Sequence, residues 1–134
     1  MQRIAVLFHK PSDSWQDRFI QIFIPEIFRA PYLHVSFAIG DDYYSFTRRG
    51  LEVLDIKSCV LETMYWFYTN DPDHYSHEAF ERCNEKVTLG SLLLARMGFE
   101  ANTCASLVGE IVFGEYLPYP CQIEKCILDD SKWY

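Results

Sequence analysis

The feature that most constrains the fold is a segment, residues 34–40, in which apolar side chains alternate with small or polar ones. The apolar positions are Val35, Phe37 and Ile39, and the positions between them are His34, Ser36 and Ala38. A period of two residues is that of a β-strand with one apolar face and one small, polar face. Asp41 and Asp42 predict a short turn, and residues 43–49 then return as an antiparallel partner strand that Gly50 ends.

The rest of the chain predicts further strands and helices. Further strands are predicted over residues 3–8, 51–57 and 60–68, and the last of these is apolar enough to be central in a sheet. Helices are predicted over residues 15–23, 76–86 and 88–97, from Asn102 to Gly114, and over a short stretch near the end.

Size and composition indicate one folded unit. A chain of 134 residues can bury roughly two-thirds of the surface that its unfolded form exposes, so residues 1–134 are expected to form a single domain. Hydrophobic residues make up 49% of the chain, which disfavours disorder. The net charge of -7 repels phosphate, so nucleic acid and anionic membrane surfaces are not expected partners. The apolar run at residues 4–8 is too short for a signal peptide or a membrane span, and a cytoplasmic location is expected.

Five cysteines are an odd number without the spacing of a disulfide framework, which fits a reducing compartment. Cys104 is the best placed nucleophile among them. Asn102 is a favoured N-cap residue and puts Cys104 in the first helical turn, where the positive end of the helix dipole favours a thiolate. The alternative is that Cys104 is a small buried residue, as unpaired cysteines often are.

His34 is the candidate base for this thiol. It opens the predicted strand on the face of Ser36 and Ala38, whose small side chains would let a helix approach closely. An imidazole at a strand start that faces a helix start can come within ~3 Å of a thiol. The alternative is an ordinary histidine at the surface end of a strand.

Three segments carry a resemblance to a known family. Residues 29–40, RAPYLHVSFAIG, resemble the histidine strand of the circularly permuted branch of the NlpC-like papain superfamily, which includes YiiX-like and lecithin:retinol acyltransferase-like proteins. Residues 43–49, YYSFTRR, look like the strand that follows in that family. Residues 102–112, NTCASLVGEIV, look like its nucleophile helix, and the order of histidine before cysteine also matches.

The resemblance implies an α+β, papain-like fold, in which the nucleophile helix packs on an antiparallel sheet that carries the base. It also implies acyl transfer through a thioester at Cys104, with His34 as general base. The sequence departs from the family in one respect, because many members have a His, Glu or Asn that orients the imidazole from the next strand. Here the candidates for this role are Thr47, which is predicted to lie diagonal to His34, and Glu52 on the following strand.

Other residues that could have a function are better explained by structural roles. His74, His77, Cys83, Cys121 and Cys126 could supply zinc ligands, but their spacing fits no tight pair of ligand knuckles. Cys121 and Cys126 could also form a redox pair. The aromatic run at residues 65–68 is typical of a strand core, and His9 is expected at the surface after the first strand.

The leading hypothesis is therefore a cysteine hydrolase, a peptidase or amidase that acts on an amide or ester and needs no metal or organic cofactor. Its substrate would be a peptide, an amide or a lipid ester. The alternatives are a lipid acyltransferase or thioesterase and, because the third residue is weak, an inactive papain-like module for binding or assembly.

Overall fold

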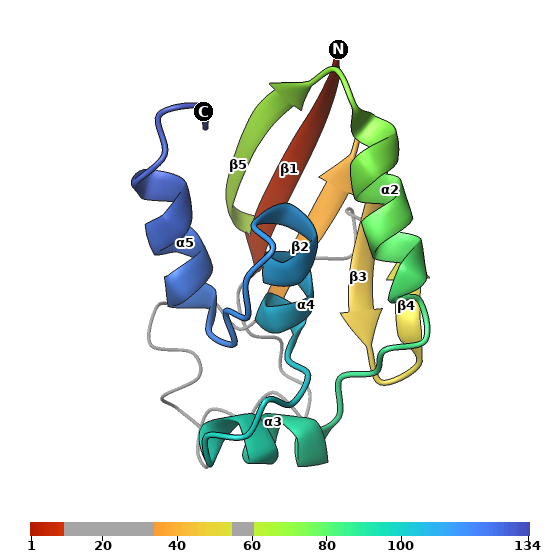
Figure 1. The fold of residues 1–134 in the computed structure, drawn as a ribbon, viewed down its shortest axis with the longest axis vertical. Helices are drawn as coiled ribbons and strands as arrows, with labels where there is room; N and C mark the ends of the chain where they lie inside the picture. The colour runs from red at the N-terminus through yellow and green to blue at the C-terminus, as the bar shows by residue number, and fades with distance from the viewer. Residues whose placement is uncertain (10–33, 55–60) are drawn as a thin grey trace.

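The computed structural model describes residues 1–9, 34–54 and 61–134, and in these ranges the chain is an α+β protein (Figure 1). The strands are β1 (Gln2–His9), β2 (His34–Ile39), β3 (Asp42–Thr47), β4 (Gly50–Val53) and β5 (Leu61–Thr69). The helices are α2 (Pro72–Glu81), α3 (Leu89–Arg96), α4 (Cys104–Val112) and α5 (Pro120–Leu128). The helix predicted over residues 15–23 lies outside the described residues.

The strands form one antiparallel sheet in the order β4-β3-β2-β1-β5. The predicted central position of the 60–68 segment was wrong, because β5 is the last strand in this order and β1 lies between β2 and β5. The burial of β1 explains its inner place: residues 4–9 are all buried. A strand covered on both faces reads as a continuous apolar run, whereas the described side chains of β5 are mostly half-buried and Tyr68 is exposed.

The turn between β2 and β3 differs from the predicted one. Ile39 pairs with Asp42, so Gly40 and Asp41 make the turn and Asp42 belongs to β3. Gly40 adopts a φ of 62°, a left-handed conformation that glycine adopts without steric cost, and this decides the position of the turn. The pairing shifts by two residues from the predicted register, which leaves each side chain on its predicted face.

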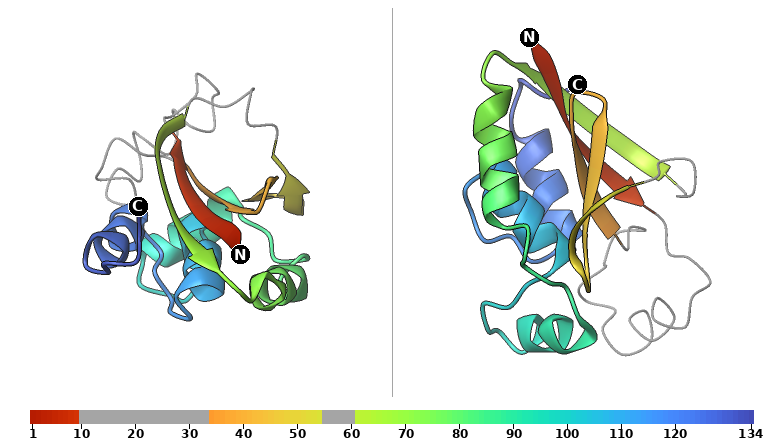
Figure 2. Two further views of the ribbon diagram at one scale, coloured as in Figure 1. Left: turned by 90° about the horizontal axis from the view of Figure 1, so that it is seen from above. Right: turned by 90° about the vertical axis from the view of Figure 1, so that its right-hand side faces the viewer.

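The helices cover one face of the sheet (Figure 2). α2, α4 and α5 lie across this face, and α3 lies beyond the end of the sheet at which β2 begins (Figure 1). The helix predicted over 76–86 begins earlier, at Pro72, because the Asp71 side chain accepts a hydrogen bond from the His74 N–H and proline suits the first helical position.

The core lies between the sheet and these helices. From the sheet it takes side chains such as Phe8, Val35 and Phe37, and from the helices Leu107, Val108 and Ile123. A smaller buried group, which includes Ala5, Leu7 and Ala38, lies on the other face. Most large apolar side chains of β1 and β2 thus point toward the helices, and Ala5, Leu7 and Ala38 point away.

The chain between α2 and α3 is attached to the β3–β4 hairpin. The Leu51 N–H donates to the Cys83 carbonyl at 3.0 Å, and the Val87 N–H donates to the Thr47 carbonyl at 3.0 Å. A Cβ at Gly50 would lie 2.5 Å from the Cys83 oxygen, so only glycine permits this approach. At the opposite end of the strand order, the backbone of Tyr134 exchanges two hydrogen bonds with that of Trp66 on β5.

Candidate active site

Cys104 is the first residue of α4, so its predicted place in the first turn is confirmed. The predicted N-cap, Asn102, was wrong: the N-cap is Thr103. Thr103 and Ser106 form a capping box, in which the Thr103 hydroxyl accepts from the Ser106 N–H at 2.9 Å and the Ser106 hydroxyl accepts from the Thr103 N–H at 2.9 Å. Asn102 instead donates to the Glu85 carboxylate at 2.8 Å, so its side chain points away from the helix start.

The start of α4 is fixed by packing as well as by its cap. The Thr103 hydroxyl donates to the Pro118 carbonyl at 2.7 Å, which ties the helix start to the segment before α5. One turn further on, a Cβ at Gly109 would lie 3.0 Å from the Ile123 side chain, so this glycine lets the two helices approach closely. Cys104 is 4% exposed, and its thiol is therefore held in a position that the fold determines.

α4 packs on β2, but on the face opposite to the predicted one. The helix contributes Leu107, Val108 and Ile111 to the same core as Val35 and Phe37. The expectation that it approaches over Ser36 and Ala38 was wrong. Burial of apolar area at about 25 cal/mol per Å² favours contact between the large side chains of both elements.

His34 is the first residue of β2 and is exposed. By alternation it shares a sheet face with Ser36, whereas α4 covers the other face. The start of α4 and the start of β2 nevertheless lie at the same end of the sheet (Figure 1). Cys104 and His34 thus come from opposite sides of one rim of the sheet.

The two candidates for the third residue lie on the same sheet face as His34. Glu52 pairs with Ser45 and Thr47 pairs with Gly50, which places both side chains opposite to Phe46 and Leu51 of the core. The Thr47 hydroxyl donates to the Glu52 carboxylate at 2.7 Å. The predicted diagonal position of Thr47 relative to His34 assumed a turn at Asp41 and Asp42, and it was wrong because the register of β2 and β3 is shifted by two residues.

His9 is the residue of this end of the sheet that the sequence interpretation missed. It was expected at the surface, but it is the last residue of β1, is 5% exposed and pairs with His34 across the two strands. Its Nε2 lies 2.5 Å from the Ser36 Oγ. Burial, and after it the positive charge of His34, lowers the pKa of His9 to about 4. Its position after an apolar strand could have indicated this, because strands often extend a residue beyond their apolar run.

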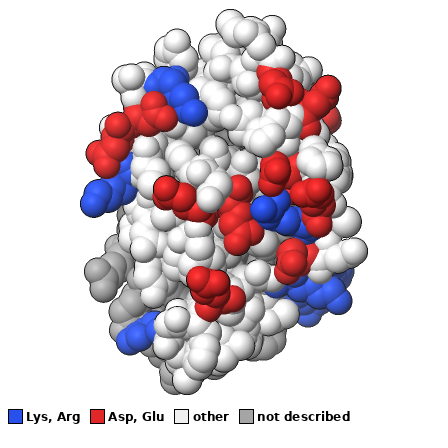
Figure 3. Space-filling view, viewed as in Figure 1, with Lys and Arg blue, Asp and Glu red and all other residues white. Residues whose placement is uncertain are grey.

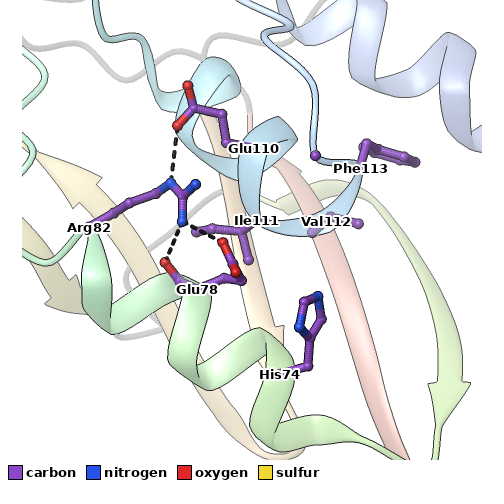
Figure 4. Close-up of a pocket in the computed structure, with 8 residues that line it drawn as sticks. His74, Glu78, Arg82, Glu110, Ile111, Val112 and Phe113 are labelled. Carbon is purple, nitrogen blue, oxygen red and sulfur yellow. Dashed lines mark hydrogen bonds and ion pairs between the residues drawn. The ribbon is translucent and has the colours of Figure 1, made fainter.

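A pocket of about 350 Å³ lies between α2 and the C-terminal half of α4 (Figure 4). Arg82 crosses it and contacts Glu78 at 2.7 Å and Glu110 at 3.1 Å. His74 and Phe113 line its other side. Neither Cys104 nor His34 lines this pocket. Acidic side chains are spread over the face that carries these helices, with basic ones among them (Figure 3).

The histidines and cysteines that were considered as zinc ligands and set aside on their spacing form no metal-binding cluster among the described residues. In residues 1–9, 34–54 and 61–134, no group of three His, Cys, Asp or Glu side chains could hold a metal ion. His77 instead contacts Glu81, four residues further along α2, at 2.8 Å. Cys121 and Cys126 are not joined in a disulfide, and burial raises the pKa of the Cys126 thiol.

Fold and site together define an α+β protein with a cysteine at the start of a helix that packs on a five-stranded antiparallel sheet. Comparisons of the chain with family models, with curated proteins and with solved structures find no match. Among the described residues, no helix is both long enough and apolar enough to span a membrane.

Proposed function

We propose that the protein is a cysteine hydrolase of papain-like fold that cleaves an amide or ester through a thioester, with Cys104 as nucleophile and His34 as general base. One observation supports the proposal above others. α4 begins at Cys104 and packs on β2, the strand that begins at His34, so the two starts lie at one end of the sheet.

The chemistry follows from these two positions. His34 takes the proton of the Cys104 thiol, and the sulfur attacks the substrate carbonyl. The first N–H groups of α4 have no partner within the helix and can stabilise the oxyanion, to which the Cys104 N–H is the expected donor. His34 returns the proton to the departing amine or alcohol, and water, activated in turn by His34, hydrolyses the thioester.

Selective alkylation tests the nucleophile. At pH 6.5, iodoacetamide should label Cys104 faster than Cys83, which is exposed and is not at a helix start. Cys126 should label most slowly, because burial raises its pKa. Equal labelling rates of Cys104 and Cys83, measured by mass spectrometry of the peptides, would contradict the proposal.

A second candidate is a binding module without turnover, and the burial of Cys104 favours it. The thiol is 4% exposed, and β2 presents to α4 the face opposite to that of His34. A thiol-directed activity probe distinguishes the two candidates. The hydrolase should react in the native protein and lose the reaction in Cys104→Ala, whereas the module should react only after unfolding.

The fate of the acyl group separates hydrolysis from transfer to another acceptor. A lipid acyltransferase would form the same thioester at Cys104. Hydroxylamine added during turnover captures the acyl group as a hydroxamate in either case. Partition to water without an added acceptor supports the hydrolase, and dependence on an alcohol or amine acceptor supports the transferase.

A further inference from the structure

Two histidines face each other across the strands at the end of the sheet where the candidate base lies. His9 ends β1 and His34 begins β2, and the register of the antiparallel pair sets them directly opposite. Side chains opposite each other in such a pair have Cβ atoms about 5 Å apart and lie on the same face. His9 is 5% exposed, whereas His34 is exposed.

In the described part of the chain, one ring nitrogen of His9 has a hydrogen-bond partner, and the other is buried without one. Nε2 lies 2.5 Å from the hydroxyl of Ser36, which is itself 1% exposed. Nδ1 is buried and has no hydrogen-bond partner among the described residues. An unsatisfied buried polar atom destabilises the fold, so a partner that reaches His9 Nδ1 would stabilise this position.

The protonation state of His9 suits an acceptor. Because its pKa is lowered to about 4, the ring is neutral near pH 7. If Nε2–H donates to the Ser36 hydroxyl, Nδ1 carries a lone pair. A neutral ring with a lone pair stabilises a neighbouring imidazolium, which is the form that His34 takes after it accepts the thiol proton.

We propose that His9, held by Ser36, is the positioning residue of His34: it orients the imidazole of His34 and stabilises its protonated form. The inference rests on the proposed function, in which His34 is the base. It assigns to β1, the strand before the base, the role that the sequence predicts for Thr47 or Glu52 on β3 and β4. These two residues are hydrogen-bonded to each other at 2.7 Å and serve here as controls.

The test follows the His34 ring by NMR as the pH is changed. His9→Leu removes the lone pair, and Ser36→Ala removes the group that orients the His9 ring. Each should lower the titration midpoint of His34 by about half a pH unit. In His9→Gln, whose amide has both a donor and an acceptor, the midpoint of His34 should stay close to that of the wild type. Thr47→Val should leave the midpoint unchanged.

The outcomes separate this inference from the proposed function. An unchanged His34 midpoint in folded Ser36→Ala, or in His9→Leu where it folds, overturns the positioning role, and so does a midpoint in His9→Gln as low as that in His9→Leu. The alkylation rate of Cys104 tests the function by itself: it should fall in His34→Ala and, more modestly, in His9→Leu. If the midpoint shifts but the rate of Cys104 does not depend on His34, the hydrolase proposal fails and the His9–His34 coupling stands.

Discussion

α3 and α4 begin with the same cap and differ in nearly everything around it. Thr88 and Thr103 are both N-caps with φ of -123° and ψ of 165° and 164°, and each forms a capping box with a serine three residues on. Thr88 is exposed, and α3 presents large apolar side chains such as Leu94 to solvent. Thr103 is 1% exposed, and α4 lies in the core.

The difference shows what a cap does and does not decide. The local pattern of threonine and serine determines where each helix begins, and it does so equally well in both places. Packing determines the surroundings of the first helical residue. Leu89 of α3 is half-buried, whereas Cys104 of α4 is buried at one end of the sheet. A cysteine at a helix start is thus only half of a site, and the tertiary contacts of α4 supply the other half.

The largest expected difference is in the free energy of unfolding. Thr103→Ala leaves the buried Ser106 N–H and the Pro118 carbonyl without a partner and should cost about 3 kcal/mol. Thr88→Ala should cost about 1 kcal/mol, because water replaces the lost bond at an exposed cap. Urea unfolding measures both. Thr103→Ser keeps the oxygen and should recover most of the loss; equal costs at the two caps would contradict the comparison.

Acid should affect the two helix starts differently. The folded pKa of His9 is about 4 and the ordinary pKa of a histidine is 6.5, so the unfolded chain binds this proton more readily. The stability that neutral His9 contributes is complete above pH 6.5 and is lost as the pH falls from 6.5 toward 4, by up to about 3 kcal/mol. Amides of α4 should therefore lose up to about 100-fold in hydrogen-exchange protection between about pH 7 and pH 4.

The amides of α3 serve as the internal reference for this acid effect. Leu93, Leu94 and Met97 are exposed, so α3 is expected to open locally, without the sheet. Its protection, corrected for intrinsic rates, should change little over the same range. His9→Leu should abolish the difference between the two helices, and a pH effect that persists in this variant would assign it to another group.

A cysteine introduced at the start of α3 sharpens the comparison at the level of reactivity. In Leu89→Cys, the new thiol has the same helical position and the same kind of cap as Cys104. α3 lies beyond the end of the sheet, however, and does not pack across β2 as α4 does. His34→Ala should slow the alkylation of Cys104 by about tenfold and leave that of the introduced thiol unchanged. Peptide mass spectrometry follows both sites in one sample, and an equal response of the two thiols would refute the thiol–imidazole pair.

The smallest expected effect concerns the serines of the two boxes. The Ser106 hydroxyl accepts from the Thr103 N–H at 2.9 Å, and the Ser91 hydroxyl makes the same bond to Thr88. Ser106→Ala should cost about 1.5 kcal/mol because the site is buried, and Ser91→Ala about 0.5 kcal/mol. Thermal unfolding of both variants measures the two costs, and a larger loss in Ser91→Ala would reverse the expected order.

Local patterns predicted much of this fold. The alternation around Phe37 gave β2 and its antiparallel partner, because a period of two is a property of the strand itself. The first-turn position of Cys104 followed from nearby capping residues, with an error of one in the N-cap. The α+β class with an antiparallel sheet, which the structure has, was implied by the family resemblance of the segments at residues 29–40 and 102–112.

What could not be predicted depends on contacts between distant parts of the chain. The face of β2 that α4 covers is decided by the match of Phe37 with Leu107 and Val108. The edge place of β5 depends on the strand order. The burial of His9 depends on its pairing with His34, which lies 25 positions later in the sequence. No local pattern contains these three facts.

The attachment of the α2–α3 connection to the β3–β4 hairpin has a consequence for how the molecule opens. Leu51 and Val87 each donate an amide proton to the other segment, so separation of the two segments breaks both bonds. The hairpin and the connection therefore form one cooperative unit, in which both amides become exposed in the same event.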